Sequence, residues 1–282
     1  MIGARLPNTS RRGRLSPTLH VAVGCALLLG ACHPRSDGRS AAPPPPAADA
    51  AQTSYMTPPR VLLAARLEGG GVALSGHTDP EARVRLQSPG GPAYGVTAGA
   101  DGTWTLATPP VETVRLLGIS EVVGSRAVQS EGYLAVIPAP GQPAIMLRAG
   151  SGSQAIAAAA AAPWISAVDF DAGGGAVVSG LAKPGDPVRV SVDGASAGEA
   201  RPDPSGHFSV ELTTMLTAGG HRAEAQSGAG VSRIDFAFAP PPPISGLPYV
   251  SQRQANDWRI DWLTPGGAPQ TTLAFDPPKG GR

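Results

Sequence analysis

Cysteine is nearly absent from this chain of 282 residues, which has only two, at positions 25 and 32. The sequence after position 32 therefore cannot form an internal disulfide or a thiolate metal site. Charged residues make up 15% of the chain, aromatic residues 5%, and the formal net charge is +1. This balance provides no basic surface for nucleic-acid phosphates, so we do not expect nucleic acid as a partner.

The chain also lacks an apolar run long enough to span a bilayer near its N-terminus. The run from Val21 to Ala31 is shorter than the roughly 20 residues that a membrane-spanning helix needs. It follows four arginines, at positions 5, 11, 12 and 14. A charged segment followed by an apolar run of about 7 to 15 residues is typical of a signal peptide, which we predict over residues 1–31.

The apolar run ends in Leu29-Gly30-Ala31-Cys32. This tetrapeptide resembles the lipobox of bacterial lipoproteins, in which the cysteine is acylated and becomes the new N-terminus. The resemblance implies cleavage before Cys32 and a membrane anchor on that residue, and the absence of Asp at position 33 implies the outer membrane, with the face undetermined. An ordinary signal peptide with an incidental cysteine, or an uncleaved anchor, remains the alternative.

Glycine and proline are abundant, with 37 and 31 residues, which favours short strands and turns over long helices. Residues 32–58 are rich in alanine and proline and include four consecutive prolines, Pro43 to Pro46. Such a segment buries too little apolar surface to offset the entropy of ordering. We predict a disordered tether there.

The chain contains an internal repeat at an offset of 104 residues. Residues 69–86 read GGGVALSGHTDPEARVRL, residues 173–190 read GGGAVVSGLAKPGDPVRV, and the match continues without a gap to residues 101–106 and 205–210. Agreement of this length indicates a duplicated domain. We place the two copies at residues 59–142 and 163–240.

Apolar residues alternate within each copy, for example at Val84 and Leu86 or at Phe208 and Val210, as half-buried strands require. Many short strands in roughly 80 residues favour a two-layer β-sandwich. The Ser-Gly, Val-Arg and Gly-x-Trp or Gly-x-Phe succession resembles the bacterial immunoglobulin-like domains. The predicted fold is therefore all-β, with two tandem immunoglobulin-like β-sandwiches whose cores contain Trp104 and Phe208.

The two segments that follow the predicted copies differ from them in composition and predict other structures. Residues 143–162 include an unbroken alanine run and Gly-Ser residues, and we predict a linker. Residues 241–282 begin with prolines and continue with two alternating stretches around a Pro-Gly-Gly turn. We predict a C-terminal β-hairpin in this tail.

The predicted domains contain few candidate catalytic or metal-ligating residues. The three histidines at 77, 207 and 221 lack a metal-ligand spacing and are predicted to face solvent. Calcium held by Asp79, Asp101, Asp169 and Asp171 remains an open alternative, although no loop has the EF-hand spacing. We therefore expect no metal, no cofactor and no catalytic residue.

The tail supplies the candidate binding residues Trp258, Trp262 and Arg259. Two tryptophans on one strand face could stack on sugars or anchor a protein, with Arg259 on the other face. The alternative is core packing against the second sandwich.

The sequence thus predicts a non-catalytic cell-envelope lipoprotein with a structural or protein-binding role. Its expected partners are the membrane, through acylated Cys32, and an envelope protein or a glycan. The two alternatives are a carbohydrate-binding or adhesive module that uses Trp258 and Trp262, and an accessory subunit of an envelope secretion machine.

Overall fold

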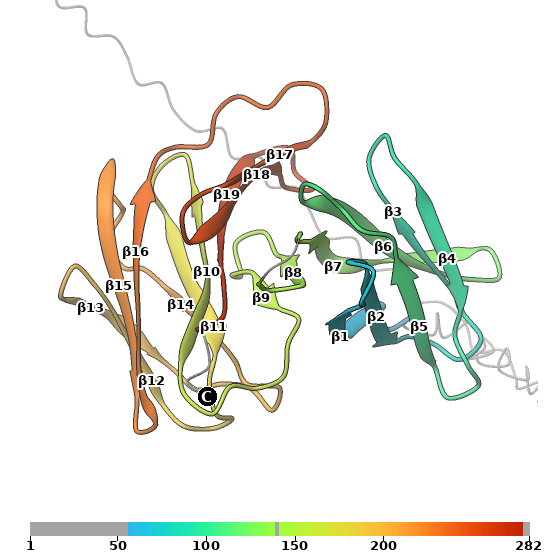
Figure 1. Cartoon of the computed structure of the whole chain (residues 1–282), viewed down its shortest axis with the longest axis horizontal. Coiled ribbons are helices and arrows are strands. Elements are labelled where there is room, and N and C mark those ends of the chain that lie inside the picture. The colour runs from blue at the N-terminus through green and yellow to red at the C-terminus, as the bar shows by residue number, and fades with distance from the viewer. Residues whose placement is uncertain (1–55, 139–140, 279–282) are drawn as a thin grey trace, which may run out of the picture. The chain divides into compact units, whose positions relative to one another are not determined.

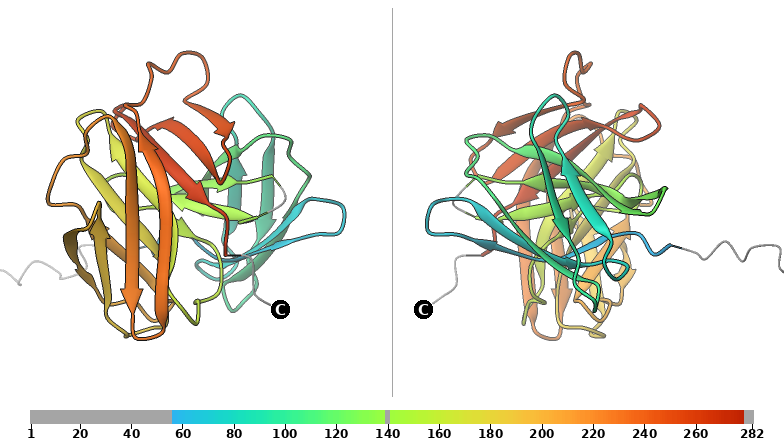
Figure 2. Two further views of the ribbon diagram at one scale, coloured as in Figure 1. Left: turned by 60° about the vertical axis from the view of Figure 1, so that its left-hand side comes forward. Right: turned by 90° about the vertical axis from the view of Figure 1, so that its right-hand side faces the viewer.

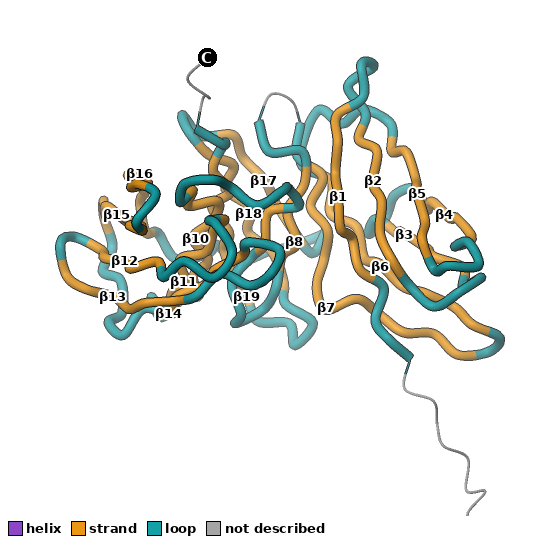
Figure 3. Tube along the Cα trace, turned by 90° about the horizontal axis from the view of Figure 1, so that it is seen from below, coloured by secondary structure: helices purple, strands orange, loops and turns teal. Residues whose placement is uncertain are grey.

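The computed structural model describes residues 56–138 and 141–278. The predicted signal peptide, the lipobox-like tetrapeptide with Cys32 and most of the predicted tether lie outside the described residues. Every regular element that the structure describes is a β-strand, as Figure 3 shows. Within the same residues, none forms a helix long and apolar enough to cross a membrane.

The first repeat folds as a sandwich of seven antiparallel strands (Figure 1). The order of one sheet is β1-β2-β5, and β4-β3-β6-β7 forms the other. The strands are β1 (Arg60–Arg66), β2 (Val72–His77), β3 (Arg83–Gln87), β4 (Ala93–Thr97), β5 (Thr103–Thr108), β6 (Arg115–Val123) and β7 (Arg126–Val136).

The second repeat has the same topology, with β14-β11-β10 in one sheet and β13-β12-β15-β16 in the other. These two matching seven-strand sandwiches confirm the predicted all-β, immunoglobulin-like fold. The strands are β10 (Trp164–Asp171), β11 (Ala176–Leu181), β12 (Val188–Val192), β13 (Ala195–Ala200), β14 (His207–Glu211), β15 (Gly219–Ser227) and β16 (Gly230–Phe238).

A glycine and an aromatic residue face each other at the same place in both repeats. Gly76 lies opposite Trp104, and Gly180 lies opposite Phe208. A Cβ atom at either glycine would overlap the facing aromatic ring and a neighbouring backbone carbonyl. The Ser-Gly pair that the repeats share is therefore required by the large aromatic residue that fills each core.

The segment between the repeats differs from the predicted linker. Strands β8 (Ala144–Leu147) and β9 (Gln154–Ala155) extend the first repeat's sheet beyond β7. All four residues of β8 are buried. A strand that is buried on both faces shows no alternation of apolar and polar residues, which is why the sequence pattern did not reveal it.

The tail forms the predicted hairpin from β18 (Asp257–Leu263) and β19 (Pro269–Phe275), preceded by β17 (Tyr249–Arg253). The hairpin is not separate, because β19 pairs with β10 of the second repeat (Figure 2). The sheet order becomes β14-β11-β10-β19-β18-β17. The last strands of the chain are therefore an integral part of the second sandwich's sheet.

Candidate functional site

The two tryptophans of the tail lie in the interior. Trp262 has no exposed surface and Trp258 is 9% exposed. The indole Nε1 of Trp262 donates a hydrogen bond to Thr272 Oγ1 at 3.1 Å, and its ring meets Tyr133 edge-on at 5.9 Å between centroids. A buried, hydrogen-bonded indole presents no face to a sugar, so the hypothesis of an open stacking platform is wrong.

The cluster around these tryptophans joins both repeats and the tail. It contains Val114, Leu116, Ala135, Ile137, Ile145 and Leu147 from the first repeat and β8, with Ala167, Ile260 and Ala274 from the second repeat's sheet. The core-packing alternative is thus the one that the structure supports, but the packing extends to the first sandwich as well as the second.

The Arg259 side chain makes contacts within the chain. Its guanidinium lies 2.8 Å from Asp261 Oδ1 and donates to the backbone carbonyl of Ala239 at 3.0 Å. It also lies over the ring of Phe170, 5.7 Å from the centroid. These contacts hold the start of the proline-rich segment against the sheet, and they leave Arg259 unsuited to bind a partner.

Asp169 is the centre of a buried polar cluster. Its carboxylate accepts hydrogen bonds from the backbone N and Oγ of Ser153, each at 2.6 Å, and from Thr272 Oγ1 at 2.5 Å. Burial raises the pKa of Asp169, although these hydrogen bonds act in the opposite direction. The cluster connects the segment before β9 to β10 and β19, which is a structural role.

Two of the other aspartates considered for calcium, Asp101 and Asp171, act as turn formers. Asp101 Oδ1 accepts hydrogen bonds from the backbone N and Oγ1 of Thr103. Asp171 Oδ1 accepts from the backbone N–H groups of Gly173 and Gly175. No group of three or more His, Cys, Asp or Glu side chains among the described residues is placed to hold a metal ion.

The histidines also have structural partners. His77 is exposed, as predicted, whereas His207 is half-buried and so only partly faces solvent. His221 bonds to Asp193 Oδ2 and the Thr217 carbonyl, each at 2.7 Å. Burial alone would lower the pKa of His221, but these hydrogen bonds and the Asp193 charge outweigh it and raise the pKa.

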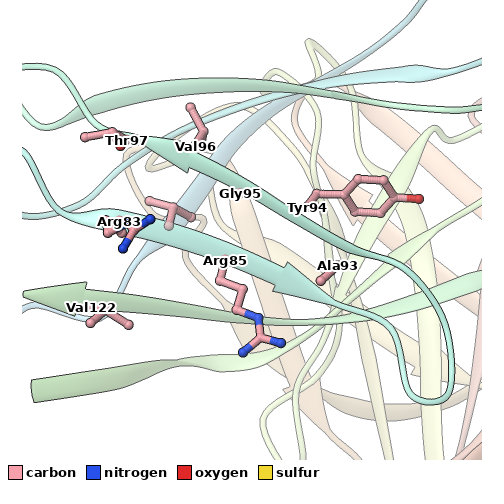
Figure 4. Close-up of a pocket in the computed structure, with 9 residues that line it drawn as sticks. Arg83, Arg85, Ala93, Tyr94, Gly95, Val96, Thr97 and Val122 are labelled. Carbon is pink, nitrogen blue, oxygen red and sulfur yellow. The ribbon is translucent and has the colours of Figure 1, made fainter.

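An open hollow with a volume of about 540 Å³ lies on the outer face of β3, β4 and β6 in the first sandwich. We call this hollow the arginine face. Arg83 and Arg85 lie on it together with Val122, whereas the ring of Tyr94 points away (Figure 4). Its floor is made of small residues of β4, Ala93, Gly95 and Thr97.

Neither arginine of this face has an acidic partner in the part of the chain that the structure describes. Across the described ranges no carboxylate lies within ion-pair distance of Arg83 or Arg85, and Arg85 donates only to Gln87 Oε1, at 2.6 Å. By contrast, six other arginines, at 148, 189, 222, 233, 253 and 259, pair with carboxylates. A planar guanidinium without a carboxylate partner is suited to bind one from outside in bidentate geometry.

Sequence reasoning missed this face. Alternation along β3 identifies Val84 and Leu86 as the buried residues, but it does not show whether the arginines between them are paired. The signal that could have found the face lies in the internal repeat, which aligns Arg85 with Arg189 and Gly95 with Glu199.

No protein-family model and no curated protein sequence matches this chain. Solved structures that it resembles include one described as "Biofilm associated protein - BSP domain", at 16% identity and a TM-score of 0.23, over 66% of this chain and 30% of that one. A second, "Ca2+-stabilized adhesin helps an Antarctic bacterium reach out and bind ice", has 14% identity and a TM-score of 0.21 over 78% and 66% of the two chains. A third, "Central Fibronectin-III array of RIM-binding protein", has 13% identity and a TM-score of 0.26 over 74% and 73%.

Proposed function

We propose that this chain is a non-catalytic lipoprotein of the bacterial cell envelope, which holds a pair of immunoglobulin-like sandwiches at a membrane for structural support or protein binding. The observation that carries the proposal is the order of its parts. A lipobox-like tetrapeptide ends in Cys32 and is followed by a proline-rich segment and then by the all-β unit. This arrangement anchors a folded module and separates it from the bilayer.

The contacts inside the all-β unit support a role without catalysis. Two titratable groups whose pKa the fold shifts, Asp169 and His221, are engaged by neighbouring hydroxyl, carboxylate or backbone groups of the same chain. Arg259 is similarly engaged with Asp261. These groups stabilise the sandwich, which leaves binding through its surface as the function that the geometry favours.

The anchor is tested with Cys32→Ser and the matched control Cys25→Ser, each expressed in a bacterial host. We expect the parent and Cys25→Ser to remain in the membrane fraction and to carry acyl groups by intact-mass measurement. Cys32→Ser should lose the acyl mass and shift to the soluble fraction, because several buried acyl chains at about 0.8 kcal/mol per methylene are removed. Equal membrane retention and processing of Cys32→Ser would overturn the proposal.

A further inference from the structure

The two repeats differ in charge at one corresponding site. The internal repeat aligns Arg85 of β3 with Arg189 of β12. In the second sandwich Arg189 lies opposite Glu199 of β13, and its Nε is 3.2 Å from Glu199 Oε2. In the first sandwich Arg85 lies opposite Gly95 of β4. The carboxylate that neutralises one arginine is therefore missing beside the other.

A second carboxylate is missing on the same face. In the second sandwich Ser191 lies opposite Glu224 of β15, which pairs with Arg233 at 2.6 Å. The residue aligned with Ser191 is Gln87, which lies opposite Gly118 of β6. Glycine thus occupies both positions at which the second repeat has glutamate.

Backbone geometry does not require glycine at these two positions. A Cβ atom on Gly95 would meet only the Val84 carbonyl, at 3.8 Å. One on Gly118 would lie 3.8 Å from the Gln87 carbonyl and 4.0 Å from the Tyr133 ring. Neither glycine has a positive φ. The missing side chains leave open space beside Arg85, in contrast to Gly76, where the neighbouring Trp104 excludes a side chain.

We infer that the arginine face binds an acidic protein segment in extended conformation, lying along β4, whose carboxylates occupy the space that Glu199 fills in the second sandwich. This inference rests on the proposed binding function of the chain. Arg83 and Arg85 are two residues apart on one strand, so their side chains emerge about 7 Å apart. Carboxylates two residues apart in an extended acidic segment have the same spacing.

The position of β4 fits such a partner. Among the strands that the structure describes, β4 pairs only with β3 and forms one edge of its sheet. An edge strand presents free backbone N–H and C=O groups to which an extended segment can hydrogen-bond. Stacking of a sugar is less favoured here, because the Tyr94 ring packs towards the core and its hydroxyl accepts a hydrogen bond from Arg115 at 2.9 Å.

The test uses the full-length chain purified in detergent and a labelled synthetic peptide of alternating Glu and Thr residues, with fluorescence anisotropy as the measurement. We expect saturable binding that weakens as salt is added, since these charges are exposed. A Lys-Thr peptide of the same length should not bind. Gly95→Glu, which introduces the second repeat's own acid, should weaken binding of the acidic peptide at least tenfold.

Two matched variants separate charge from shape. Gly95→Gln adds the same bulk without charge and should bind within about threefold of the parent, because a side chain fits at this position. Glu199→Gly should free Arg189 and add binding capacity. Equal loss with Gly95→Gln and Gly95→Glu, no effect of Gly95→Glu, absence of peptide binding, or binding of polygalacturonate in place of the peptide would each overturn the inference. These outcomes leave the membrane-fractionation result for Cys32 unaffected, so the two proposals fail separately.

Discussion

At the scale of single residues, Asp257 is a carboxyl group that the fold buries without a full set of partners. It is 5% exposed, and its Oδ1 has no hydrogen-bond partner among the described residues. Burial raises its pKa from 3.8 to about 6, despite the nearby charges of Arg253 and Arg259, and the charge of Asp276 acts in the same direction as burial. Asp257 therefore lowers stability at neutral pH.

The sign of the pH effect follows from the raised pKa. Below 3.8 the carboxyl is protonated in both the folded and the unfolded chain. Between that value and about 6 the unfolded chain has released its proton while the folded chain retains it. The free energy of unfolding thus falls as the pH rises through this interval. Above the interval, the ionised and buried Asp257 destabilises the folded chain to the full extent.

We predict that Asp257→Asn raises the free energy of unfolding at about pH 7.5 by roughly 2 kcal/mol, a value reduced for partial solvent access. At about pH 3.5 the same variant should equal the parent. Denaturant titrations at the two pH values measure the difference. A gain of equal size at both values would show that ionisation of Asp257 is not its cause.

At the scale of elements, the segment that joins the two repeats is fixed by polar contacts as well as by strand pairing. Ser153 precedes β9 and bonds to Asp169 of β10, while its carbonyl accepts a hydrogen bond from Ser179 Oγ at 2.6 Å. Gly152 has a φ of +79°, and a Cβ there would lie 2.8 Å from Val177. Glycine is therefore required at this turn.

We predict that Asp169→Ala destabilises the protein by about 3 kcal/mol, because it leaves the buried donors of Ser153 and Thr272 without an acceptor. Hydrogen exchange of the amides of residues 150–156 should accelerate more than that of β15. The control Asp171→Ala removes an exposed turn contact and should cost about 1 kcal/mol or less. Unchanged exchange in residues 150–156 would contradict the role given to Asp169.

The elements also show which parts of the fold were predictable. Strands with alternating residues, such as β3 with Val84 and Leu86, were predicted because one face is buried and the other is exposed. Strand β8 was not predicted, because it is buried on both faces and its sequence does not alternate. The tail hairpin was predicted from its turn, but its pairing with β10 depends on residues about 100 positions away, which no local pattern encodes.

At the scale of the whole molecule, the described residues, 56–138 and 141–278, belong to one compact unit despite the duplication. The buried cluster around Trp262 contains side chains of both repeats and of the tail. Two repeats that share a core lose its packing when either unfolds, which couples their stabilities. The duplication in the sequence therefore does not imply independent folding.

We predict one cooperative thermal transition for the parent protein in scanning calorimetry. Trp262→Ala should cost about 4 kcal/mol through the cavity and the lost hydrogen-bond donor, and it should separate the transition into two. Met215→Ala, at a side chain that is 66% exposed, should leave a single transition at an unchanged temperature. Two transitions in the parent would refute the shared core.

The sequence by itself determined the local properties of this protein: the repeat, the turns, the alternating strands and the aromatic residues that fill each sandwich. Those properties depend on near neighbours in the chain and on the period of a β-strand. Only the tertiary structure decided that Trp258, Trp262 and Arg259 are internal. It also decided that, among the described residues, Arg83 and Arg85 lack acidic partners. Burial and charge pairing are set by strands that are distant in sequence and meet only in the folded sheets.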